Sequence, residues 1–113
     1  MTRIAIPSDD RRTVAQHFGR AAGFLVFEYD GGALTSEYRP LTEGTAHDHE
    51  RIVDVLRDCD VVIAGGMGGG MMSALYDAGI EVAISTVTEA RKAAQMLVED
   101  ILPVSSGSGC CTN

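Results

Sequence analysis

Short apolar runs alternate along the chain with stretches in which apolar residues recur at helical spacing. Four runs of aliphatic or aromatic residues predict strands at 3–7, 23–29, 61–64 and 81–84, and a hairpin signal adds a fifth at 33–39. Helical spacing predicts helices at 48–57, 71–78 and 88–100, the last ending before Pro103. The order β-β-β-α-β-α-β-α is typical of an α/β fold whose closing strand–helix units are parallel and right-handed.

Turn and cap residues mark where several of these elements end. Asp30-Gly31-Gly32 is suited to a tight hairpin, so the second and third strands are predicted to be antiparallel. Gly79 stands where a left-handed helix cap is favoured, and Thr88 is expected to cap the third helix. The loops after the first, third and fourth strands should then share the carboxyl edge of the sheet, where open α/β folds bind ligands.

Charge and composition exclude several classes of protein. The 113-residue chain has a formal net charge of −7 and no basic cluster along its sequence, which argues against sequence-independent nucleic-acid binding. No stretch approaches the roughly 20 apolar residues that cross a bilayer, and the chain begins with a strand instead of a signal segment. We expect a cytoplasmic domain over residues 1–102 that binds no membrane, and a flexible Ser/Gly/Cys tail over 103–113.

The cysteines are odd in number and do not indicate a secreted disulfide framework. Cys59 lies between the first helix and the fourth strand, at the opposite edge from the loops above, and is expected to be a buried packing thiol. Cys110 and Cys111 lie in the Ser/Gly-rich tail, where they are either exposed thiols or thiolate ligands supplied by a tail that folds back.

Every histidine falls in one of the carboxyl-edge loops. In His47-Asp48-His49, the two histidines are a candidate pair of metal ligands, because imidazole suits borderline metals. His17 from another loop could complete a site. The same residues also fit a polar helix start with two solvated histidines, and His17 alone also fits a hydrogen-bonded loop residue.

The segment Gly65-Gly66-Met67-Gly68-Gly69-Gly70 joins the fourth strand to the second helix. So much glycine costs chain entropy and implies close approach of some ligand, because it lets backbone N–H groups and the helix N-terminus face an anion. Neither the P-loop nor the dinucleotide pattern fits, although a phosphate ligand stays open. The soft thioether of Met67 favours a metal or sulfide, whereas Met71 and Met72 are expected to pack within the helix.

Four motifs in order resemble one family: Ile-Ala-Ile-Pro-Ser at 4–8, His-Phe-Gly-Arg at 17–20, the His-Asp-His loop at 47–49, and Ala-Gly-Gly-Met-Gly at 64–68. They resemble the dinitrogenase iron-molybdenum cofactor biosynthesis family, which includes NifX-type proteins and the C-terminal domain of NifB-type proteins. The resemblance implies a three-layer ribonuclease H-like fold and a non-catalytic protein that binds or carries an iron-sulfur or iron-molybdenum type cluster. Carried onto this sequence, the cluster-facing residues are His17, His47, His49 and Met67, with Gly66 and Gly68 allowing approach.

The resemblance also implies protein partners that donate and accept the metallocluster, and we expect a monomer or a weak homodimer. The ribonuclease H-like fold does not imply nuclease activity here, since Asp9 and Asp10 are adjacent and would face opposite ways in a strand. Two other functions stay open from the residues themselves. One is a regulatory module that holds a small phosphate-bearing ligand on Gly65–Gly70, and the other is an enzyme that uses His17 with a thiol or carboxylate.

Overall fold

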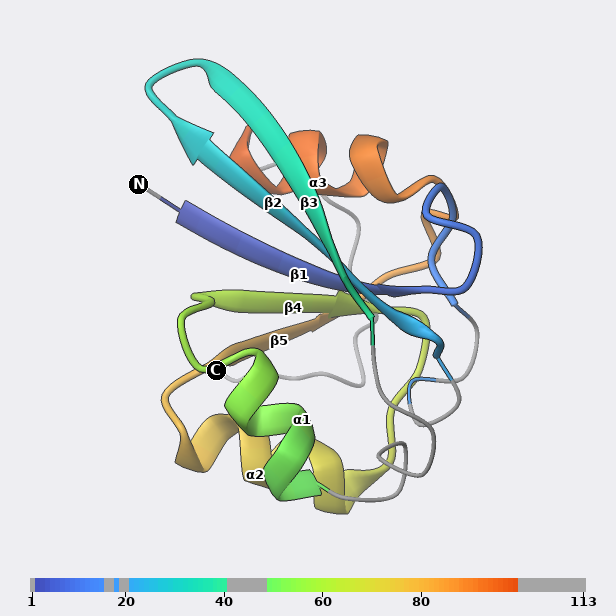
Figure 1. The fold of residues 1–113 in the computed structure, drawn as a ribbon, viewed down its shortest axis with the longest axis vertical. Helices are drawn as coiled ribbons and strands as arrows, with labels where there is room; N and C mark the ends of the chain where they lie inside the picture. Colours follow the sequence, from blue (N-terminus) through green and yellow to red (C-terminus); the bar gives the residue numbers. More distant parts are fainter. Residues whose placement is uncertain (1, 16–17, 19–20, 41–48, 100–113) are drawn as a thin grey trace.

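The structure, a computed structural model, describes residues 2–15, 18, 21–40 and 49–99 (Figure 1). Within these residues the chain forms a mixed five-stranded sheet covered by helices, in the predicted order β-β-β-α-β-α-β-α. No described helix has the length and apolar character needed to cross a membrane. The strands are β1 Thr2–Ser8, β2 Gly23–Asp30, β3 Ala33–Pro40, β4 Val61–Ala64 and β5 Glu81–Ile84, and the helices are α1 His49–Val55, α2 Gly69–Asp77 and α3 Ala90–Val98.

The sheet has the strand order β3-β2-β1-β4-β5. β2 is antiparallel to both β1 and β3, whereas β1, β4 and β5 are parallel to one another. The carboxyl ends of β1, β3, β4 and β5 therefore lie at one edge, because β3 runs in the same direction as β1. This confirms that the loops after β1, β3 and β4 leave the sheet from the same edge.

Helices pack on both faces of the sheet, with α1 and α2 on one side and α3 on the other (Figure 1). Each face has its own buried cluster: Val62 and Ala64 belong to the cluster under α1 and α2, while Val61 and Ile63 belong to the one under α3. All of β4 is buried, as its wholly apolar sequence predicts for a strand covered on both faces. The three-layer α/β class expected from the resemblance is therefore confirmed.

Positive backbone φ angles occur at the predicted turn and helix end. Gly31 and Gly32 have φ angles of 62° and 120° and connect Asp30 to its cross-strand partner Ala33. Gly79 has a φ of 82° directly after the C-cap of α2, which is the left-handed position that glycine occupies without steric cost.

The start of α3 and the end of α1 differ from the prediction. The N-cap of α3 is Glu89, which makes no side-chain cap hydrogen bond, and the preceding Thr88 instead offers its carbonyl to the N–H of Val14 at 2.7 Å. α1 ends at Val55, and Arg57 beyond it forms an ion pair with Asp54 at 2.6 Å. The pairing of Thr88 with Val14 depends on the tertiary fold, which cap preferences alone do not specify.

Candidate functional site

The loop after β1 is shaped by the carboxylate of Asp10. This carboxylate accepts hydrogen bonds from the backbone N–H groups of Arg12 at 2.9 Å and Thr13 at 2.8 Å, and from the hydroxyls of Thr13 and Ser8. The two backbone bonds hold the pKa of Asp10 far below its usual range, because they stabilise the charged form. Asp10 therefore acts as the anchor of a tight turn that begins at the carboxyl end of β1.

Asp9 closes the same loop from its other end. Its Oδ1 atom accepts a hydrogen bond from the backbone N–H of Ala22 at 2.8 Å, so it joins the start of the loop to the entry into β2. Both adjacent acids thus accept hydrogen bonds from the backbone of their own loop. The sequence-based predictions do not include these roles, although Ser-Asp-Asp before polar residues is a sequence signal for such side-chain-to-backbone turns.

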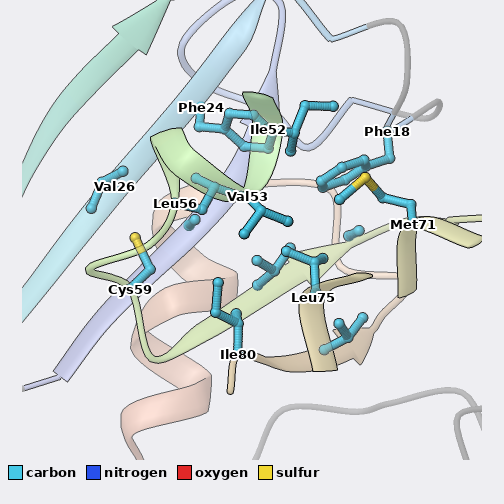
Figure 2. Packing of buried hydrophobic residues seen from close by; sticks show 14 residues of the cluster. Phe18, Phe24, Val26, Ile52, Val53, Leu56, Cys59, Met71, Leu75 and Ile80 are labelled. Carbon is cyan, nitrogen blue, oxygen red and sulfur yellow. The ribbon is translucent and has the colours of Figure 1, made fainter. Parts of the chain in front are cut away.

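Buried side chains hold the β1 and β4 loops together at the carboxyl edge. Phe18 from the β1 loop and Met71 from the first turn of α2 are only 3% and 5% exposed and belong to one cluster with Phe24, Ile52 and Leu75 (Figure 2). The rings of Phe18 and Phe24 lie 5.3 Å apart in a tilted arrangement, which favours their contact. Phe18 and Met71 therefore join the β1 loop and the start of α2 in one core.

The glycine loop after β4 is open at its helical end. Gly68 is the N-cap of α2, with φ −70° and ψ 153°, and a Cβ atom built on it or on Gly69 would meet nothing within 4 Å. Gly65 is closer to the rest of the chain, since its Cβ would lie 3.7 Å from the carbonyl oxygen of Ala15. Neither backbone strain nor internal crowding explains the glycines at 68 and 69.

The first N–H groups of α2 have no hydrogen-bond acceptor among the described residues. No described side chain caps the helix, and among the described residues no carbonyl accepts from the N–H of Gly69, Gly70 or Met71. Met72 is the first to donate within the helix, to the carbonyl of Gly68 at 3.1 Å. Open N–H groups at a helix N-terminus, together with the positive end of the helix dipole, favour an anionic ligand.

Met67 sits between these glycines and is half-buried. Its side chain packs against the cluster under α1 and α2, and Gly66 beside it is also partly buried. Met71 is buried and Met72 packs against the same cluster, as predicted for helix packing. A thioether at position 67 thus lies where the core meets the carboxyl edge.

The remaining predicted ligands are not covered by these observations. His17 and His47 lie outside the described residues, as do Cys110, Cys111 and the tail from 103 onward. His49 begins α1, but its side chain is not among those described. Within the described part of the chain, no group of His, Cys, Asp and Glu side chains is placed to hold a metal ion.

Cys59 is a packing thiol, as predicted. It is 5% exposed in the cluster under α1 and α2 (Figure 2), and burial raises the pKa of its thiol to about 12, an effect that the neighbouring charge of Asp58 reinforces. A thiol that stays protonated is a poor metal ligand, because the thiolate is the form that ligates.

Comparison with known proteins places the chain in a family. Residues 1–100 match a family model described as dinitrogenase iron-molybdenum cofactor. The fold is similar to the apo form of the orange protein from Desulfovibrio gigas, at 27% identity, 94% coverage of each chain and a TM-score of 0.71. No curated protein matches the chain.

Two further solved structures show the same fold at lower identity. A protein from Methanocaldococcus jannaschii, provisionally designated a dinitrogenase, is 16% identical with a TM-score of 0.73, over 92% of this chain and 94% of that one. A Thermotoga protein provisionally designated NifB is 22% identical with a TM-score of 0.64, over 92% and 93% of the two chains. Because the family model spans nearly the whole fold, this chain belongs to the dinitrogenase iron-molybdenum cofactor family.

Proposed function

We propose that this protein binds or carries an iron-sulfur or iron-molybdenum type metallocluster, or its precursor, without turning over a substrate. The binding region we assign is the carboxyl edge of the sheet, where the loops after β1, β3 and β4 leave it. Family membership over residues 1–100 supports a role connected with this cofactor. The similar orange protein is known in an apo form, which is in keeping with a fold that binds a ligand.

The open start of α2 is the observation that carries the proposal. Gly68 and Gly69 leave room beside a helix N-terminus that no described side chain caps, and neither glycine is required by a positive φ angle or by a close described neighbour. Concave groups of backbone N–H donors of this kind bind phosphates and iron-sulfur clusters in other proteins. An anionic cluster seated there would accept hydrogen bonds from these amides and lie next to the thioether of Met67.

The ligand set we propose combines imidazole, thioether and backbone donors. His17, His47, His49 and Met67 would coordinate or contact the cluster, while Gly66 and Gly68 allow it to approach the backbone. Cys110 and Cys111 are conditional members of this set, since thiolates are the usual ligands of iron-sulfur clusters. A carrier also needs proteins that donate and accept the cluster, and we propose that such proteins are its partners.

Anaerobic reconstitution with iron and sulfide, with and without molybdate, tests this assignment. We expect a His17→Ala, His47→Ala, His49→Ala triple variant to retain much less metal and visible absorption than the unmodified chain. A Cys59→Ala variant is the matched control, because Cys59 belongs to the core, and it should retain as much metal as the unmodified chain. A Cys110→Ser, Cys111→Ser variant shows separately whether the tail contributes.

A substitution at Gly68 separates ligand approach from folding. Gly68→Ala should change the free energy of unfolding by less than about 0.5 kcal/mol, since a slightly worse N-cap residue and a less flexible unfolded chain oppose each other. It should nevertheless lower metal retention. Metal retention equal to that of the unmodified chain in both the histidine variant and the Gly68 variant would overturn the site. Thermal stabilisation by phosphate compounds but by no cluster would instead favour a phosphate-binding regulatory module.

A further inference from the structure

A groove lies on the α3 face of the sheet, away from the glycine loop. It is bounded by the loop after β1, by the outer face of the β2–β3 hairpin and by the start of α3, and its volume is about 550 Å³. Three arginines line it: Arg11 and Arg12 from the loop, and Arg91 from the first turn of α3. The sequence shows no basic cluster, because Arg91 is distant along the chain and only the fold brings it beside the other two.

These arginines differ in their partners from three other described arginines. Arg3, Arg39 and Arg57 each form an ion pair with a carboxylate, as shown by contacts of 2.6 to 2.8 Å. Within the described residues, the guanidinium groups of Arg11, Arg12 and Arg91 form no ion pair. Arg11 lies 4.4 Å from the centre of the Tyr38 ring, and Arg91 lies 5.5 Å from that of Phe27. Arg91 also donates to the carbonyl of Leu34 at 3.5 Å, near the limit for a hydrogen bond. On a chain with a net charge of −7, three cations in one groove that no described carboxylate pairs are unexpected.

The backbone that carries the arginines is fixed against α3. Thr13 and Glu89 form a β-bridge, the N–H of Val14 donates to Thr88 at 2.7 Å, and the N–H of Ala90 donates to Arg12 at 2.9 Å. The two sides of the groove are thus joined before any ligand arrives. Such preorganisation lowers the entropic cost of binding.

The carboxylates of Asp10 and Glu89 also line the groove. Their charges determine whether removing one of them should strengthen or weaken anion binding. Asp10 accepts hydrogen bonds from the N–H groups of its own turn, and no ion pair joins it to the described arginines of the groove. Glu89 at the N-cap of α3 makes no cap hydrogen bond and adds a negative charge at the rim. An anion bound by the arginines would be repelled by Glu89.

We propose that this groove binds a small oxyanion, of the phosphate-ester or polycarboxylate class. Guanidinium groups match both anions with two parallel hydrogen bonds, and two residues that carry hydroxyl groups, Ser36 and Thr88, line the same space. The volume falls within the range of about 300–1,000 Å³ that small-molecule sites occupy. This site is separate from the metallocluster region, so either assignment can fail without the other.

Amide chemical shifts in ¹H–¹⁵N NMR spectra locate such binding directly. Titration with pyrophosphate and, separately, with citrate at constant ionic strength distinguishes the two anion classes. We expect saturable shifts of the amides at 10–13 and 88–92 for at least one of them. Arg12→Gln should weaken this binding at least about tenfold, as expected for loss of a charge-assisted hydrogen bond, and Glu89→Gln should tighten it about threefold.

Arg57→Gln is the matched control, since it removes the same charge from a residue outside the groove. It should leave the affinity unchanged at about 0.15 M ionic strength, where exposed charges are screened beyond about 8 Å. Absence of saturable shifts at 10–13 and 88–92 overturns the proposal. So do shifts confined to Gly65–Gly70, or equal weakening by Arg12→Gln and Arg57→Gln.

Discussion

Asp58 joins β3 to the turn after α1 through a two-point ion pair. Its Oδ1 and Oδ2 atoms accept from Nη1 and Nη2 of Arg39 at 2.7 and 2.9 Å, and the same Nη1 also donates to the carbonyl of Val55 at 2.8 Å. The hydrogen bonds from Arg39 lower the pKa of Asp58 to about 2 from an ordinary 3.8. This contact holds β3 against the segment that follows α1.

Stability should depend on pH through Asp58. A carboxyl group with a depressed pKa in the folded state contributes stability above its ordinary pKa of 3.8, and this contribution is lost as the pH falls toward about 2. Asp58→Asn should therefore lower the free energy of unfolding at neutral pH, by at most about 1 kcal/mol because the pair is partly solvated. The difference from the unmodified chain should shrink in urea denaturation between these pH values. A constant difference would contradict the assignment.

Single residues also show where sequence reasoning stops. Cys59 could be predicted as a core thiol from its place between two apolar elements, and it is one. Thr88 satisfies every local rule for a helix cap, yet its carbonyl is used by Val14 and the helix begins after Glu89. The arginine groove could not be predicted either, because it depends on a β-bridge between Thr13 and Glu89.

At the scale of elements, strands were easier to predict than helix ends. β4 is short and apolar on both faces, and β5 occupies the predicted residues. α2 begins at Gly69, before the predicted 71, because the packing of Met71 and Leu75 against the core outweighs the low helix propensity of glycine. Tertiary contacts thus decide the boundaries that local propensity leaves open.

The two ends of α2 should respond oppositely to alanine. Gly79 has a φ of 82°, so Gly79→Ala should lower the free energy of unfolding by about 1 kcal/mol, the cost of a left-handed residue with a Cβ atom. Gly69 is helical with open space around its Cβ position, so Gly69→Ala should raise it by about 0.4–1 kcal/mol. Chemical denaturation measures both changes in the free energy of unfolding, provided that the m-value stays the same in the variants. Effects of the same sign would show that α2 does not end as described.

For the whole molecule, the sequence predicts the architecture and the edge at which the loops after β1, β3 and β4 leave the sheet. Strand directions follow from the hairpin at Gly31-Gly32 and from the helices that follow β3 and β4, so the common edge of three loops could be inferred. The ligand geometry could not be inferred, because it depends on how loops far apart in sequence face one another. Phe18 and Met71 show the β1 and β4 loops meeting in one core, and the imidazole positions stay a prediction.

The most direct test of the central claim is the metal content of the full chain after anaerobic reconstitution with iron and sulfide, with and without molybdate, and desalting. The account predicts metal in stoichiometric proportion to protein, with visible absorption typical of a metallocluster. A chain that is folded by circular dichroism but leaves the desalting column without metal or visible absorption, under both conditions, would contradict it.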